Sequence, residues 1–249
     1  MNILLCLDKT LKNQLIGLIY NISKSQISLE KITIEILYSG LTNKDTVKIN
    51  SFANSLGLKI VMHLVSQDLC RGFPTWGHGS LANYFRLFFT EIIDPTSSRT
   101  LYLDLDIFIF DDLTELWEID LQNQTIGAHG DDDKSFNSGI MLIDNDKWLK
   151  IDIPTKTREI INEGKLPLTW WDNDILNHIF FQRWLDFGKK WNLMPSRFKS
   201  SKTEPVIVHF AGSSKPWHGK YNLPYANSYK KNFWRARLRY IIQSMIRSL

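Results

Sequence analysis

The segment TLYLDLDIFIFDDLTELW, residues 100–117, decides the fold and carries the first chemical signal. Its first four residues form a short apolar run that predicts a buried strand, and Asp104 and Asp106 follow directly. Two unpaired carboxylates on one strand face would be costly to bury, so we expect a positive partner. Mg²⁺ or Mn²⁺ is suitable, because hard cations take carboxylate oxygens and bridge substrate phosphates. The alternative is a turn with solvated carboxylates.

A second informative segment is VIVHFAGSSKPWH, residues 206–218, in which a predicted strand over 206–208 ends at His209. The small residues Gly212, Ser213 and Ser214 allow backbone N–H groups to converge on an anion, and Lys215 adds a positive charge. This pattern predicts a diphosphate-binding turn. His209 either has a structural role or completes a metal site, which would favour Mn²⁺ over Mg²⁺ because nitrogen ligands suit the softer ion.

A third segment is TWWDNDILNHIF, residues 169–180, where three polar residues precede a helical apolar pattern. We expect one of Asp172, Asn173 and Asp174 to cap the helix and the others to face a cavity. The preceding pair, Trp170 and Trp171, belongs either to the core or to a surface that stacks on a sugar ring.

The chain on the N-terminal side of these segments alternates between strand and helix patterns. Strands are predicted over residues 3–7, 31–38 and 58–64, and helices over 11–24, 42–56 and 80–93. This order is typical of an α/β fold with a βαβ sheet. Asp8 follows the first strand, where ligands bind in such sheets, although a plain helix cap is the alternative. Arg86, among apolar residues of the third helix, is either a ligand contact or a surface or salt-bridged arginine.

Composition limits the classes of protein that remain. The chain has 249 residues, with 43% hydrophobic and 22% charged residues, which favours one packed domain. The two cysteines, Cys6 and Cys70, are too few for a disulfide framework or a thiolate zinc site. We find no leader sequence and no apolar stretch of membrane-spanning length, and we expect a cytoplasmic protein.

The C-terminal part of the chain is strongly basic, with eight Lys or Arg and no acid after Glu204. We divide the chain into a catalytic domain, residues 1–220, and a basic amphipathic tail, residues 221–249. An apolar stripe lies on one helical face of this tail, flanked by arginines; its members are Trp234, Leu238, Ile241, Ile242, Met245 and Leu249. We expect this helix to rest on an anionic membrane. The alternatives are packing on the protein's own body or on a second subunit, and nucleic acid is disfavoured as a partner.

Taken together, these motifs resemble glycosyltransferase family 8, which includes bacterial lipopolysaccharide galactosyl- and glucosyltransferases and glycogenin. The resemblance covers most of residues 1–218. In chain order, the matching segments are LLCLD, SLANYFRL, YLDLD, FNSG, DNDILN and HFAGSSKPW. It implies a GT-A nucleotide-sugar transferase fold, which is a single Rossmann-like domain with a mixed central sheet, together with Mn²⁺, a UDP-sugar donor and retention of anomeric configuration.

The resemblance also implies roles for particular residues. The metal ligands would be Asp104, Asp106 and His209, and the diphosphate would be held by Gly212 and Lys215. Asp8 would contact the uracil, and the donor sugar or its phosphates would be contacted by Arg86, Asn137 and Asp172. This sequence departs from the family at Asn173, where the galactosyltransferases have Gln, and in the connection over residues 127–136, which looks shorter and contains Asp131, Asp132 and Asp133.

The expected reaction moves a hexose from UDP-galactose or UDP-glucose to a hydroxyl of a glycan acceptor, in lipopolysaccharide or other surface glycan synthesis. We assign the catalytic positions to Asp172 and Asn173 and favour attack by the acceptor from the leaving-group side over a covalent intermediate. We expect a location in the cytoplasm, peripheral on the inner face of the cytoplasmic membrane. Two rival interpretations are a metal-dependent D-x-D phosphatase, disfavoured by Phe108, and a non-catalytic nucleotide- or membrane-binding module.

Overall fold

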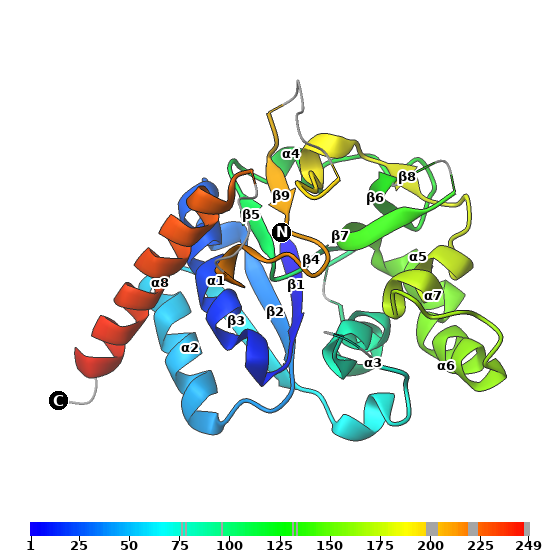
Figure 1. The fold of residues 1–249 in the computed structure, drawn as a ribbon, viewed down its shortest axis with the longest axis horizontal. Coiled ribbons are helices and arrows are strands. Elements are labelled where there is room, and N and C mark those ends of the chain that lie inside the picture. The colour runs from blue at the N-terminus through cyan, green and yellow to red at the C-terminus, as the bar shows by residue number, and fades with distance from the viewer. Residues whose placement is uncertain are drawn as a thin grey trace.

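A computed structural model describes residues 1–75, 77, 79–95, 97–130, 132, 134–197, 204–218 and 224–246 of the chain. Seven strands form one mixed sheet in the order β3-β2-β1-β4-β7-β6-β8 (Figure 1). Their bounds are β1 Asn2–Leu7, β2 Thr33–Tyr38, β3 Lys59–Leu64, β4 Arg99–Leu103, β6 Ile126–Gly130, β7 Phe136–Asp144 and β8 Leu185–Asp186. Strands β3, β2, β1 and β4 run parallel, whereas β7 is antiparallel to both β4 and β6. The expected α/β fold with a mixed sheet is confirmed.

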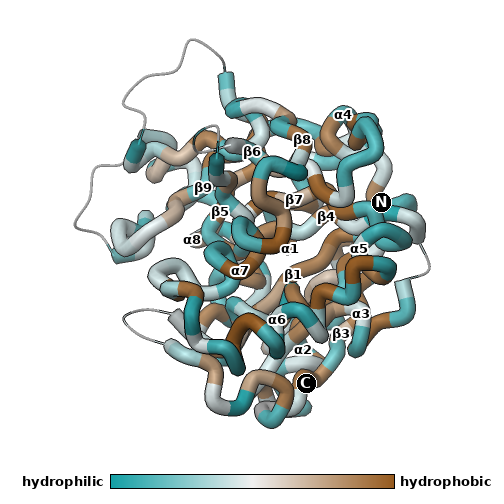
Figure 2. Tube along the Cα trace, turned by 90° about the vertical axis from the view of Figure 1, so that its right-hand side faces the viewer, coloured by the Kyte–Doolittle hydropathy of each residue, from teal (hydrophilic) through white to brown (hydrophobic). Residues whose placement is uncertain are grey.

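Helices cover the sheet on both faces. One face carries α1 Lys12–Ser25, α2 Asn43–Ser55 and the C-terminal helix α8 Ala226–Ile246. The other carries α3 Phe89–Ile92, α5 Asn145–Ile151, α6 Ile153–Glu163 and α7 Asp172–Ile179, while α4 Thr114–Trp117 follows the small ribbon described below. Alternate residues of β1 supply the two cores, Ile3 and Leu5 to the first and Leu4 and Cys6 to the second. The central strands are accordingly hydrophobic along their length (Figure 2).

A second, two-stranded ribbon lies at the edge of the sheet where the acidic motif occurs. Strand β5, Ile107–Ile109, pairs antiparallel with β9, Ile207–His209, so that Ile107 lies opposite His209. This pairing brings together two segments that lie about 100 positions apart in the sequence. It places His209 opposite Ile107, the residue that follows Asp106.

Two predicted elements differ in the structure. The segment predicted as a helix over 80–93 is a 3₁₀ helix over Leu81–Phe88 followed by the single turn of α3. Its bounds agree with the prediction, because the Ser80 side chain caps its start and it ends before Asp94. The prediction that a polar residue caps α7 is wrong. The N-cap is Trp171, with φ of +52° and no side-chain hydrogen bond, because Asp172 already lies within the helix.

The C-terminal helix has two apolar faces. Its inner face packs on α1 and α2 through Tyr229, Phe233, Ala236 and Tyr240. The predicted stripe lies on the other face, where Trp234, Leu238 and Met245 are each more than 60% exposed. Packing of that stripe on the protein's own body is therefore excluded for these residues. No helix in the described part of the chain has the length and apolar character required to cross a membrane.

Some predictions fall on residues outside the described ranges. These are Asp131, Asp133, Leu249 and the boundary near residue 220. The division into residues 1–220 and 221–249 stays a prediction.

Candidate active site

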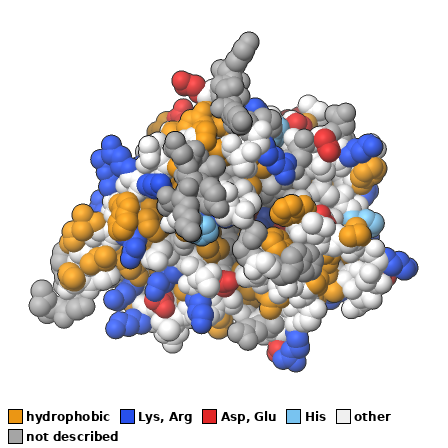
Figure 3. Space-filling model, viewed as in Figure 1, with side chains coloured by type: hydrophobic (Ala, Val, Ile, Leu, Met, Phe, Trp, Pro, Cys, Tyr) orange, Lys and Arg blue, Asp and Glu red, His pale blue; other side chains and the backbone are white. Residues whose placement is uncertain are grey.

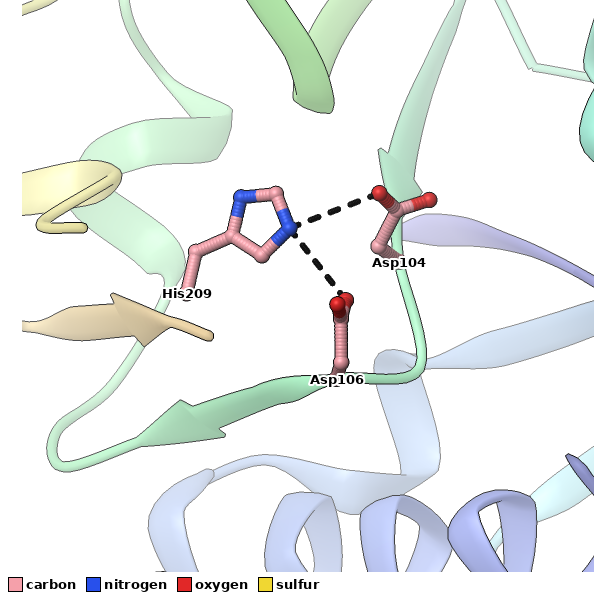
Figure 4. A group of neighbouring side chains, drawn as sticks. All are labelled: Asp104, Asp106 and His209. Carbon is pink, nitrogen blue, oxygen red and sulfur yellow. Dashed lines mark ion pairs between the residues drawn. The ribbon is translucent and has the colours of Figure 1, made fainter. Parts of the chain in front are cut away.

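Asp104, Asp106 and His209 meet at the carboxyl end of β4, as the sequence predicts (Figure 4). The two aspartates lie in the turn between β4 and β5, and His209 is the last residue of β9. The His209 Nε2 atom lies 3.5 Å from Asp104 Oδ2 and 3.2 Å from Asp106 Oδ1. One ligand atom from each residue lies within 4.8 Å of the other two. Two carboxylates and one imidazole at this spacing are a donor set for one divalent cation.

Gly139 explains how the backbone of β7 can lie against this cluster. Its carbonyl accepts a hydrogen bond from the Asp104 N–H at 2.8 Å. A Cβ at this position would lie 2.2 Å from His209 Cε1 and 2.8 Å from Asp104 Oδ2. The FNSG motif therefore requires glycine at its last position because any side chain would displace two of the three candidate ligands.

Arg86 lies beneath the cluster and is 5% exposed. Its Nη2 is 2.9 Å from Asp104 Oδ1, its Nε is 3.0 Å from Asp172 Oδ2, and its Nη1 donates to the Ser138 carbonyl at 2.8 Å. The guanidinium also stacks on the Tyr102 ring, whose hydroxyl donates to Asp104 at 2.6 Å. Arg86 is thus a buried counter-charge for two carboxylates. The salt-bridged alternative is confirmed, and a surface position is excluded.

Asp172 begins α7 and is 3% exposed. Burial raises its pKa to about 7, although the nearby Arg86 charge acts in the opposite direction. The Arg86 Nε–H donates to the Asn83 carbonyl, so the contact between Arg86 and Asp172 is an ion pair without an aligned hydrogen bond. A buried carboxyl with this pKa, next to a candidate metal site, is a common feature of functional sites.

Asn173 and Asn137 connect α7, β7 and the metal cluster. The Asn173 carbonyl oxygen, Oδ1, accepts a hydrogen bond from the Ser138 N–H at 2.9 Å. Asn137 Oδ1 accepts from the Gly139 N–H and from Asn192 Nδ2, each at 3.0 Å. Both amides are therefore part of a rigid hydrogen-bonded network that holds the backbone of β7 beside the candidate ligands.

Lys215 and Gly212 lie in the loop after β9. The Lys215 ammonium contacts Asp106 and donates to the Phe210 carbonyl at 2.9 Å. Burial alone would raise the pKa of Asp106, but Lys215 and His209 together hold it well below its usual range. Gly212 has φ of +86°, in the left-handed region that favours glycine, and a Cβ there would meet no atom within 4 Å.

Asp8 lies just beyond the carboxyl end of β1, the strand that runs parallel to and beside β4. Its Oδ1 accepts hydrogen bonds from the Thr10 N–H and hydroxyl, so the alternative of a helix cap is confirmed, while contact with the uracil stays a prediction. The same edge of the sheet carries Asp104, which is the position where ligands bind in open α/β sheets. Of the aromatic pair before α7, Trp171 is buried with its ring where a side chain at Gly79 would lie, whereas Trp170 is half exposed.

Sequence analysis assigns no role to two residues of this site. Asn192, fully buried, contacts His209, and Tyr102 contacts Asp104. Tyr102 begins the YLDLD motif without a role of its own there, and Asn192 lies in an irregular segment between Trp191 and β9. Only the tertiary structure reveals their contacts with the candidate ligands.

The fold is of the GT-A type. A crystal structure of the galactosyltransferase LgtC in complex with donor and acceptor sugar analogues has the same fold, with a TM-score of 0.84 and 24% identity over 94% of this chain and 96% of that one. The model of glycosyl transferase family 8 matches residues 2–220, and the chain belongs to this family.

Two curated relatives are similar to this chain over most of its length. General stress protein A of Bacillus subtilis is 26% identical over 92% of this chain and 91% of its own length. A lipopolysaccharide 1,3-galactosyltransferase of Salmonella typhimurium is 24% identical over 71% of this chain and 61% of its own length. The family match does not favour the phosphatase and the non-catalytic module.

Proposed function

We propose that this enzyme moves a hexose from UDP-galactose or UDP-glucose to a hydroxyl of a glycan acceptor, with retention of anomeric configuration. The observation that carries this proposal is the convergence of Asp104, Asp106 and His209 with Lys215 at one edge of the sheet. Two carboxylates with an adjacent imidazole and ammonium form a site that accepts a cation together with a polyanion, and a nucleoside diphosphate is such a ligand.

We propose Mn²⁺ as the cation, with Mg²⁺ as the alternative, held by Asp104, Asp106 and His209. The imidazole supports Mn²⁺, because nitrogen ligands suit this ion better than Mg²⁺. Three protein ligands would leave positions for diphosphate oxygens. When bound, the cation would stabilise the negative charge that develops on the departing UDP.

The residues around the cluster would act on the donor. Lys215, with the turn around Gly212, would hold the diphosphate, and its place beside Asp106 supports this role. Asp8 would contact the uracil at the carboxyl end of β1. Asn137 would contact the donor sugar, since its nitrogen Nδ2 is not used in the bond to Gly139.

Asp172 and Asn173 would lie beside the donor sugar that reacts. Arg86 would hold the carboxylates of Asp172 and Asp104 in position next to that sugar and its phosphates. Asp172 is buried and its pKa is raised to about 7, which weakens it as a nucleophile at neutral pH. The Asn173 oxygen is already bonded to the Ser138 N–H. Both facts support attack by the acceptor from the leaving-group side over a glycosyl-enzyme intermediate.

The acceptor of the hexose would be a surface glycan. We propose a hydroxyl of lipopolysaccharide or another surface glycan, supported by the likeness to the Salmonella galactosyltransferase. The experiment is UDP release from UDP-galactose, UDP-glucose and their N-acetyl forms, with and without Mn²⁺. Metal-dependent release from a hexose donor is expected. Release of phosphate from phosphomonoesters instead would support the phosphatase, and no turnover with any donor would contradict the proposal.

We further propose that α8 rests on an anionic membrane, at the inner face of the cytoplasmic membrane. Its outer face gathers hydrophobic side chains bordered by Lys and Arg (Figure 3). The opposite face already packs on the protein, so the exposed stripe is available for contact. Each basic residue near an anionic surface contributes on the order of 1 kcal/mol. The two free cysteines are consistent with a reducing compartment.

Sedimentation with liposomes tests this membrane proposal. Deleting α8 would expose the core that it covers on α1, so the full chain is compared with a triple variant, Trp234→Gln, Leu238→Gln and Met245→Gln. The control replaces Ile27 and Leu64 by Gln, which are exposed elsewhere. We expect the wild type and the control to sediment with anionic liposomes at low salt and the triple variant to stay in the supernatant. Equal sedimentation of all three would contradict the proposal.

A further inference from the structure

The two ring nitrogens of His209 face different groups. Nε2 faces Asp104 and Asp106, whereas Nδ1 lies 3.0 Å from Asn192 Oδ1. Asn192 is fully buried, and its side chain hydrogen-bonds to this histidine and to Asn137. Its carboxamide therefore acts on the site through its neighbours.

A backbone N–H sets the direction of every hydrogen bond in this chain of side chains. The Gly139 N–H can only donate, so the Asn137 atom that it contacts at 3.0 Å is the carbonyl oxygen. Asn192 contacts the same oxygen at 3.0 Å and must present its amide nitrogen there. Its carbonyl oxygen is then directed at His209 Nδ1, which must carry the hydrogen. In a neutral ring, the lone pair is left on Nε2.

We propose that Asn192 is a positioning residue that holds His209 in the tautomer with hydrogen on Nδ1, presenting the Nε2 lone pair to a divalent cation between Asp104 and Asp106. A metal-binding histidine commonly has its ring orientation and tautomer set by a partner on its other nitrogen. Here the partner is itself oriented by the backbone of β7, through Asn137. The inference rests on the proposed metal site and adds a residue that the metal-binding geometry alone does not include.

Two substitutions separate this role from simple packing. Asn192→Leu keeps a similar volume but removes the acceptor for Nδ1–H, and we expect Mn²⁺ affinity to fall roughly 10–100-fold, as for loss of such a partner elsewhere. Asn192→Asp keeps an acceptor facing Nδ1–H and should retain most of the affinity. The matched control is Asn145→Leu, a buried asparagine bonded to Ser97 and remote from the site, which should bind Mn²⁺ like the wild type.

Mn²⁺ binding is measured by electron paramagnetic resonance of the free ion, on full-length chains shown to be folded by thermal melting. The tautomer is read from long-range ¹H–¹⁵N correlations of ¹⁵N-histidine protein with Mg²⁺ bound, and the His209→Gln variant identifies the His209 signals. The wild type should show hydrogen on Nδ1. A wild-type signal with hydrogen on Nε2, or a folded Asn192→Leu variant with unchanged Mn²⁺ affinity, would overturn the inference.

These measurements do not use a sugar donor, so the two proposals can fail separately. A wild type that turns over UDP-hexose with Mn²⁺ while Asn192→Leu binds the ion normally defeats only the positioning role. A wild type that binds Mn²⁺ in the expected tautomer but transfers no sugar defeats only the proposed function. A wild type without Mn²⁺ affinity defeats both.

Discussion

Gly139→Ala is the substitution whose effect on the site follows most directly from distances. The added methyl carbon would lie 2.2 Å from His209 Cε1, whereas ordinary contacts begin near 3.4 Å, so the ring or the strand must move by more than 1 Å. Asp104 Oδ2, at 2.8 Å from the same carbon, must move as well. The site cannot relax easily, because β7 pairs with β4 at this point and His209 is fully buried.

A displacement of about 1 Å in a catalytic group can lower turnover roughly 100-fold, and overpacking costs about 1–3 kcal/mol of stability. We therefore expect Gly139→Ala to remain folded, to bind Mn²⁺ weakly and to release UDP from UDP-hexose roughly 100-fold more slowly. The assays are Mn²⁺ titration, coupled UDP detection and urea denaturation. The control is Gly17→Ala in α1, where the new methyl meets only the Phe233 side chain at 3.3 Å. Wild-type Mn²⁺ affinity and turnover in Gly139→Ala would refute the reasoning.

Three further predictions concern charged groups of the site. Asp106→Ala or His209→Ala should lower turnover by roughly 100-fold or more while the fold survives; an active Asp106→Ala enzyme with normal metal dependence would contradict the ligand assignment. Lys215→Ala should weaken UDP and UDP-sugar binding together by about 1.5–3 kcal/mol, and unchanged UDP affinity in calorimetry would argue against diphosphate contact. Because the pKa of Asp172 is raised to about 7 in the folded state, the stability it contributes is fully present below pH 4 and is lost as the pH rises through about 7. Between pH 5 and pH 8 the wild type should therefore lose about 2–3 kcal/mol of unfolding free energy relative to Asp172→Asn in urea titrations, and parallel pH profiles would show that Asp172 titrates normally.

The elements next to the site could be predicted because their signals are local. The apolar run before Asp104 places that aspartate at a strand end, and the alternation of strands and helices over residues 3–64 predicts parallel pairing with a common ligand-binding edge. The motif that contains His209 and Lys215 predicts an anion-binding site from its own residues, without knowledge of the residues that it contacts in the fold. The same local reading failed at α7, because Trp171 takes the cap position in a backbone conformation that few residues other than glycine favour.

Sequence patterning by itself determined the α/β class, the pair of aspartates at a strand end, and the separate motif that carries His209 and Lys215. Each of these features depends on residues within a few positions of one another. Only the tertiary structure decided that Arg86 is buried between Asp104 and Asp172, that Gly139 makes room for His209, and that Asn192 faces its ring. It likewise decided which face of α8 packs on α1 and which stays exposed. The contacts around the site join residues that are 17 to 86 positions apart, and α8 contacts α1 across 215 positions. Their energies depend on strand pairing and burial that no local pattern encodes.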